Sequence, residues 1–164
     1  MQLFSYIGTG VLAAVAALLI LAAISDIMHR RISNRLVVSI VALFAIWAVS
    51  LLANGAPLYN VLIWPLVTAL IVFAVGAALF AVRLMGGGDV KLLAAIALFA
   101  GPTLSLPFVL YVVVAGGFVA AGTLIIARVG KPTEPTAATT VPYGVAITVG
   151  GLWVCFQQFS GLSA

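Results

Sequence analysis

Acidic side chains are rare in this sequence, which has only Asp26, Asp89 and Glu134. Asp26 follows a long apolar run in "AAISDIMHRRISNRL", and Asp89 stands between three glycines and a second apolar run in "RLMGGGDVKLL". Ionisable groups at or inside a membrane boundary are costly and therefore often mark function. Asp26 and Asp89, if brought together, could activate a water molecule, with one carboxylate as base and the other as acid.

A carboxylate pair of this kind requires neither a metal nor a cofactor nor a nucleophilic side chain. Like charges about 3 Å apart cannot both ionise, so the pair shares one proton. The ionised member takes a proton from the attacking water, and the protonated member donates to the developing oxyanion. The N-terminus of a helix favours a charged Asp89 as the base, whereas Arg30 could stabilise the charge on Asp26. The two roles therefore stay open.

Both acids also have a purely structural interpretation. Asp26 could pair with Arg30 one helical turn later, and Asp89 could be an N-cap that accepts backbone N–H bonds. For a structural subunit of this kind, both acids would be replaceable without loss.

The glycines at 86–88 exceed what a helix cap requires, because one glycine would suffice. Gly86, Gly87 and Gly88 remove every side chain from the approach to Asp89 and permit backbone angles that other residues avoid. We therefore expect an extended peptide to lie against this loop. A phosphate-binding loop is disfavoured, because the Walker pattern needs Lys and then Ser or Thr after its last glycine.

The elements that position these acids are membrane helices, since 65% of the 164 residues are hydrophobic and 6% are charged. A spanning helix needs roughly 20 apolar residues. The sequence predicts a single all-α, membrane-embedded domain over residues 1–164, a bundle of six transmembrane helices. The predicted helices are 3–25, 36–53, 58–82, 89–101, 104–128 and 142–160.

Two features refine this bundle. The fourth helix is short, and Pro102 and Pro107 in "AGPTLSLP" predict a tight turn after it. Four intrahelical glycines are expected to let helix backbones approach closely in lipid. They are Gly76, Gly116, Gly117 and Gly122.

The basic residues predict the topology. All seven lie in or beside alternate connections, on one side of the membrane: Arg30, Arg31, Arg35, Arg83, Lys91, Arg128 and Lys131. The positive-inside rule then places both termini outside and the charged loops in the cytoplasm. The first 25 residues lack a basic region, so we expect a retained helix rather than a signal peptide.

Composition also excludes several classes of protein. A single cysteine, Cys155, rules out an internal disulfide framework and a cysteine-based zinc cluster. The basic residues are few and flank membrane segments, so a nucleic-acid partner is not expected.

Three segments resemble motifs of type IV prepilin peptidases. "SDIMHRRISN" at 25–34 and "GGGDVKLL" at 86–93 resemble the two aspartate motifs, and "VPYGVAITVGG" at 141–151 resembles the third recurrent segment. Their order and spacing agree, over essentially the whole chain. One departure is Ser33, where the family commonly has proline.

The resemblance implies an aspartic, GxGD-type endopeptidase that removes the leader of a prepilin just before its hydrophobic segment, after a glycine. Asp26 and Asp89 match the catalytic pair. The chain lacks the long insert and the Cys pairs of bifunctional members, so it resembles the peptidase-only form of Tad or Flp pili, without N-methyltransferase activity. The implied partners are a prepilin with a basic leader, the lipid bilayer of the bacterial inner membrane and other pilus assembly proteins.

Other polar or backbone-breaking residues have weaker interpretations. His29 and Glu134 are expected to be solvated loop residues, and Lys91 could orient Asp89 or only satisfy the topology. Pro142, Tyr143 and Gly144 break the backbone before the last helix, either as a helix start or as substrate-binding residues.

Three other activities compete with a prepilin peptidase. A proton- or ion-coupled transporter would use the same carboxylates, although it predicts acids near the membrane midplane. Presenilin-type and signal-peptide-peptidase-type proteases share the chemistry but place their aspartates within helices. An archaeal preflagellin peptidase is the related enzyme most easily confused with this one.

Overall fold

The computed structural model describes residues 2–129 and 143–163, so Lys131, Glu134 and Pro142 lie outside the described residues. Every element of the described chain is helical, as predicted. The elements are α1 (Gln2–His29), α2 (Asn34–Ala53), a π-helical segment η1 (Tyr59–Ile63), α3 (Trp64–Ala81), α4 (Gly87–Val129) and α5 (Tyr143–Ser163).

Four helical stretches of the described chain are long and apolar enough to cross a membrane. They are Tyr6–His29, Asn34–Ala53, Tyr59–Ala81 and Gly87–Thr123. The predicted count of six spans is not confirmed, because α4 runs across both the fourth and the fifth predicted helices and α5 is not among the four stretches. The membrane orientation stays a prediction.

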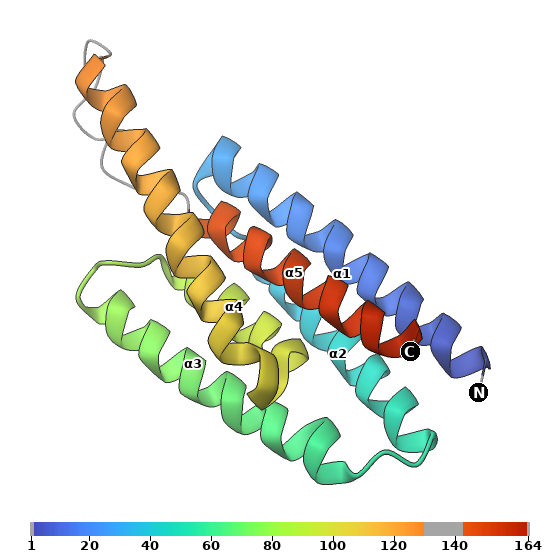
Figure 1. Cartoon of the computed structure of the whole chain (residues 1–164). Coiled ribbons are helices and arrows are strands. Elements are labelled where there is room, and N and C mark those ends of the chain that lie inside the picture. Colours follow the sequence, from blue (N-terminus) through green and yellow to red (C-terminus); the bar gives the residue numbers. More distant parts are fainter. Residues whose placement is uncertain (1, 130–142, 164) are drawn as a thin grey trace.

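Helix α4 is interrupted at Gly101, as the predicted turn requires. Gly101 has φ 57° and ψ −169°, which L-residues rarely adopt, and Pro102 follows it without a backbone N–H to donate. Figure 1 shows the chain turning back at this point. We call residues 87–100 the inner limb of α4 and residues 102–129 its outer limb.

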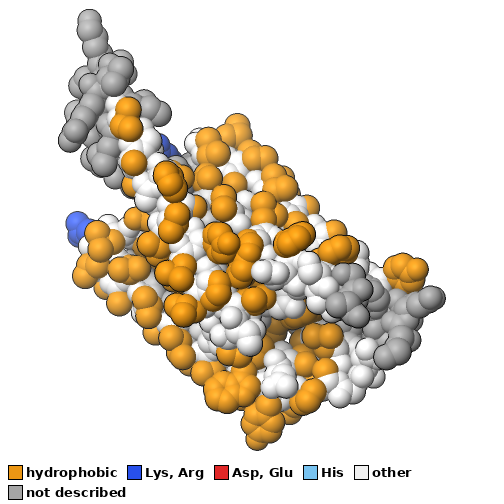
Figure 2. Space-filling view, in the orientation of Figure 1, with side chains coloured by type: hydrophobic (Ala, Val, Ile, Leu, Met, Phe, Trp, Pro, Cys, Tyr) orange, Lys and Arg blue, Asp and Glu red, His pale blue; other side chains and the backbone are white. Residues whose placement is uncertain are grey.

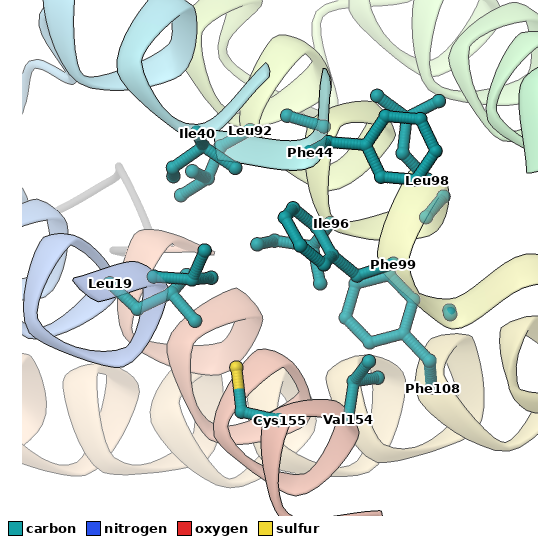
Figure 3. Packing of buried hydrophobic residues seen from close by; sticks show 14 of the residues in the cluster. Leu19, Ile40, Phe44, Leu92, Ile96, Leu98, Phe99, Phe108, Val154 and Cys155 are labelled. Carbon is teal, nitrogen blue, oxygen red and sulfur yellow. The ribbon is translucent and has the colours of Figure 1, made fainter. Parts of the chain in front are cut away.

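The inner limb forms the centre of the bundle. Leu92, Ile96 and Phe99 are almost completely buried, and Figure 3 shows them among side chains of the neighbouring helices. The Phe99 ring stacks on Trp47 of α2, with centroids 5.5 Å apart, and meets Phe44 edge-on at 5.3 Å. From Leu92 to Ala100 the limb is apolar on all sides, as is expected of a helix that is surrounded by others.

Glycines allow close packing at some of the predicted positions. A Cβ on Gly76 would come within 2.9 Å of Val90, so this glycine lets α3 approach the inner limb. A Cβ on Gly116 would lie 3.6 Å from the Tyr143 ring, which is ordinary contact. Gly117 and Gly122 show no such contact, because no described atom lies within 4 Å of the position their Cβ would take.

The connections 30–33 and 82–86 lie at one end of the bundle, and the two chain termini lie at the other (Figure 1). Apolar side chains cover most of the face seen in Figure 2. Arg30 and Arg31 follow α1, and Arg83 precedes α4, so these charges gather at the end that holds the two connections.

Candidate active site

Asp26 and Asp89 line the same cleft, which has a volume of about 700 Å³. Arg30, Arg83 and Tyr143 line it too. Both acids also border a smaller cavity of about 300 Å³, beside Gly86, Gly87 and Gly88. The fold therefore brings together the two carboxylates that the sequence singled out.

Asp26 lies in the last turn of α1, which continues to His29 and not to residue 25 as predicted. Its side chain is buried, with 5% of its surface exposed. The backbone N–H of Gly144 donates a hydrogen bond to Asp26 Oδ2 at 2.8 Å. Gly144 is the second residue of α5, where helical N–H groups lack an intrahelical partner and the helix dipole attracts negative charge. Asp26 thus joins the end of α1 to the start of α5.

Gly144 leaves no room for a side chain. A Cβ at this position would lie 2.7 Å from Asp26 Oδ2, 2.8 Å from its Cβ and 2.9 Å from its Cγ. The close approach of the α5 backbone to Asp26 therefore depends on glycine. The sequence grouped Gly144 with Tyr143 as a helix start or a binding segment, and the structure gives it a direct contact with the acid.

Asp89 lies in the first turn of α4, which begins at Gly87. The predicted N-cap role is therefore wrong, because the helix starts two residues earlier. The carboxylate turns back to the backbone of Gly86, as an acid at the third helical position commonly does. Its Oδ1 is buried and has no hydrogen-bond partner among the described residues. Asp26 is close enough for its charge to act on Asp89.

The three glycines before Asp89 allow neighbouring groups to approach closely, and they do not adopt unusual backbone angles. Gly86, Gly87 and Gly88 are not among the glycines with positive φ, so that expectation is wrong. A Cβ on Gly86 would meet Asp89 Oδ2 at 2.7 Å, and one on Gly88 would meet Ile32 at 3.2 Å. The glycines therefore leave space for the Asp89 carboxylate and for the connection that follows α1.

Two arginines that line the cleft have left-handed backbones, which no sequence pattern predicted. Arg30 has φ 52° and Arg83 has φ 61°, and they are the non-glycine residues with positive φ in the described chain. Each follows the end of a helix, where glycine is common because this conformation disfavours a Cβ. In the sequence, a helix end that has no glycine lies beside each aspartate motif. This absence of glycine could have revealed the two left-handed arginines.

The remaining predicted site residues divide between the cleft and its surroundings. Tyr143 is half-buried and lines the cleft. Lys91 Nζ donates to Asn34 Oδ1 at 3.1 Å, which joins α4 to the start of α2, and this contact does not orient Asp89. His29 is exposed, as expected of a solvated residue.

The departure at Ser33 preserves the local backbone shape. Ser33 has φ −68° and ψ 135°, a conformation that proline also adopts. Its hydroxyl caps α2 by accepting the backbone N–H of Arg35 at 3.2 Å. Serine therefore provides a cap where proline would provide rigidity.

Comparison with known proteins identifies one family. The model of the type IV leader peptidase family matches residues 13–121. The matched range contains Asp26, Asp89 and the three glycines. Neither curated proteins nor solved structures gave a match.

Proposed function

The chain belongs to the type IV leader peptidase family, and we propose that its cleft hydrolyses the leader of a type IV prepilin with water activated by Asp26 and Asp89. The observation that carries this proposal is the shared cleft. The two acids come from opposite ends of different helices, the last turn of α1 and the first turn of α4, yet they line one cavity.

The chemistry follows from two carboxylates that share one proton. The ionised carboxylate takes a proton from water as the water oxygen bonds to the peptide carbonyl carbon, and the protonated carboxylate donates to the carbonyl oxygen. When the C–N bond breaks, a carboxylate returns a proton to the leaving amine. Because the two sites are coupled, the base and acid roles belong to the pair.

The backbone around the pair suits an extended substrate. Gly86, Gly87 and Gly88 border the smaller cavity and present no side chain to a peptide that approaches Asp89. Arg30 and Arg83 supply positive charge on the walls of the cleft, which favours negative charge as it develops on a carbonyl oxygen.

The proposal extends to a peptidase-only enzyme of Tad or Flp type at the bacterial inner membrane. The single cysteine, Cys155, supports this form, since the bifunctional form has Cys pairs in a long insert. We propose that the site faces the cytoplasm, because the basic residues near the acids favour that side.

A proton- or ion-coupled transporter is the less favoured alternative. It requires carboxylates along a path through the membrane. Asp26 and Asp89 both lie in terminal turns of their helices, at the end of the bundle that carries the basic connections. Transport would appear as ion uptake by proteoliposomes that depends on these two carboxylates.

Separate Asp26→Asn and Asp89→Asn variants test the proposed function, with cleavage of the prepilin followed in membranes. Each substitution keeps the side-chain size but removes the ionisable group, so we expect cleavage to fall about 100-fold or more. Glu134→Gln is the matched control, since it removes the third carboxylate and should retain full cleavage. Full cleavage by a well-expressed Asn variant would refute the carboxylate pair.

A further inference from the structure

A second cavity, of about 530 Å³, lies between α3 and the outer limb of α4. Val72 and Val75 of α3 line one side, and Val109 and Val113 of the outer limb line the other. Ser105 and Tyr143 are the only described lining residues with polar side chains. We call this cavity the apolar groove.

The apolar groove adjoins the cleft that contains the aspartates, because two residues belong to the walls of both. Met85 and Tyr143 line both cavities. The cleft carries charged residues, including Asp26, Asp89 and Arg83, whereas none of the described residues that line the groove is charged. A molecule that passes Met85 and Tyr143 therefore moves from a charged site to an apolar one.

Two residues of the outer limb that line the groove have no side chain. Gly116 and Gly117 line it, and no described atom lies within 4 Å of where a Cβ of Gly117 would be. Leu93 of the inner limb also lines the groove, so the buried centre of the bundle contributes to its wall. The open space at Gly117 thus has room for side chains of another molecule.

We propose that the apolar groove binds the hydrophobic segment that follows the scissile bond of the prepilin. This inference rests on the proposed function and names the surface that receives the apolar part of the substrate. A prepilin changes from a polar leader to an apolar segment next to the bond that is cut. The protein also changes from a charged lining in the cleft to an apolar lining in the groove, and Met85 and Tyr143 lie at this boundary. Lipid covers any exposed apolar face, but this one shares Met85 and Tyr143 with the cleft that holds the aspartates.

Val113 and Val114 offer a matched pair of positions for a kinetic test. They are adjacent on the outer limb with 64% and 57% of their surface exposed, but only Val113 lines the groove. We expect Val113→Trp to fill the groove and to lower kcat/KM for the prepilin about tenfold or more, chiefly through KM. Val114→Trp should cleave as the unmodified enzyme does. Gly117→Leu, which fills the groove from a second position, should repeat the loss.

Cross-linking tests the same inference without any need for cleavage. Val113→Cys and Val114→Cys, each with Cys155→Ala and Asp89→Asn, would carry a benzophenone label and be irradiated in membranes with the intact prepilin. We expect the label at 113, and not at 114, to join the hydrophobic segment of the prepilin. Equal cross-linking at both positions, or attachment to lipid alone, would overturn the groove assignment.

The two proposals fail in different ways. Cleavage that survives Asp26→Asn or Asp89→Asn contradicts the carboxylate pair, whatever the groove variants do. Loss of cleavage in both Asn variants, with Val113→Trp and Gly117→Leu both fully active, contradicts the groove alone. A similar loss in Val113→Trp and Val114→Trp also contradicts it, because the effect would then not depend on the groove.

Discussion

Gly144 donates its backbone N–H to Asp26 at 2.8 Å, and the start of α5 is thereby fixed to the end of α1. The contact joins the third segment of the sequence resemblance to the first. Helix α5 also contacts α1 further along, where the Thr148 hydroxyl donates to the Leu19 carbonyl at 2.9 Å. Asp26 is thus held by a helix that carries no acidic residue of its own.

Gly144→Ala tests this arrangement. The added methyl would lie 2.7 Å from Asp26 Oδ2, so α5 or the carboxylate must shift. We expect cleavage to fall about 100-fold, because a displacement of about 1 Å at a reacting group can cost that much. Gly161→Ala is the control in the same helix, since no described atom lies within 4 Å of its added methyl. An active Gly144→Ala variant would show that Asp26 tolerates displacement.

Gly86→Ala and Gly87→Ala should differ sharply. A methyl on Gly86 would meet Asp89 Oδ2 at 2.7 Å, whereas one on Gly87 would make ordinary contact with the Phe80 ring at 3.4 Å. We expect Gly86→Ala to lose most of its cleavage activity and Gly87→Ala to keep it, as measured by initial rates on the prepilin. Equal rates in the two variants would mean that the Asp89 carboxylate does not need a residue without a side chain at position 86.

Arg83→Gly should stabilise the protein. Arg83 has φ 61°, and this left-handed conformation costs roughly 1 kcal/mol for a residue with a Cβ. We expect thermal unfolding in detergent to shift upward by about 2–4 °C. Arg83→Ala removes the same guanidinium but keeps the Cβ, so it should give no such gain. Cleavage should slow in both variants, because both remove a positive charge from the cleft.

Lys91→Ala should leave the rate of cleavage unchanged. The Lys91 ammonium donates to the Asn34 amide oxygen at 3.1 Å on the surface, and this contact contributes about 1 kcal/mol or less. Asn34→Ala should cause a similar small loss of stability, and the double variant should lose no more than either single variant. A strong effect of Lys91→Ala on kcat alone would instead support the orienting role considered from the sequence.

The helical class and the meeting of the two acids could be predicted from the sequence, because hydropathy identifies helices and each acid lies at the end of an apolar run. Hydropathy does not distinguish a helix that faces lipid from one that faces protein, since both environments are apolar. The central position of the inner limb, with Ile96 and Phe99 almost completely buried, therefore had no signal in the sequence.

Local backbone geometry near the site was less predictable. Three consecutive glycines suggest unusual angles, but the positive φ values near the cleft belong to Arg30 and Arg83. A glycine can either adopt unusual backbone angles or let neighbouring groups approach closely. Tertiary packing decides which of the two occurs. The Gly144 contact with Asp26 likewise depends on how α5 lies against α1, which no single segment encodes.

The reversal at Gly101 gives the apolar groove a pivot. The outer limb forms one wall of the groove, and it joins the buried centre through Gly101, at the other end of the inner limb from Asp89. At about 1.5 Å per residue, the outer limb extends roughly 20 Å from Gly101 to Gly116, which lies beside Tyr143. A rotation of a few degrees at Gly101 would therefore widen the groove near Tyr143 by about 1 Å, while the inner limb, with Asp89 in its first turn, stays in place.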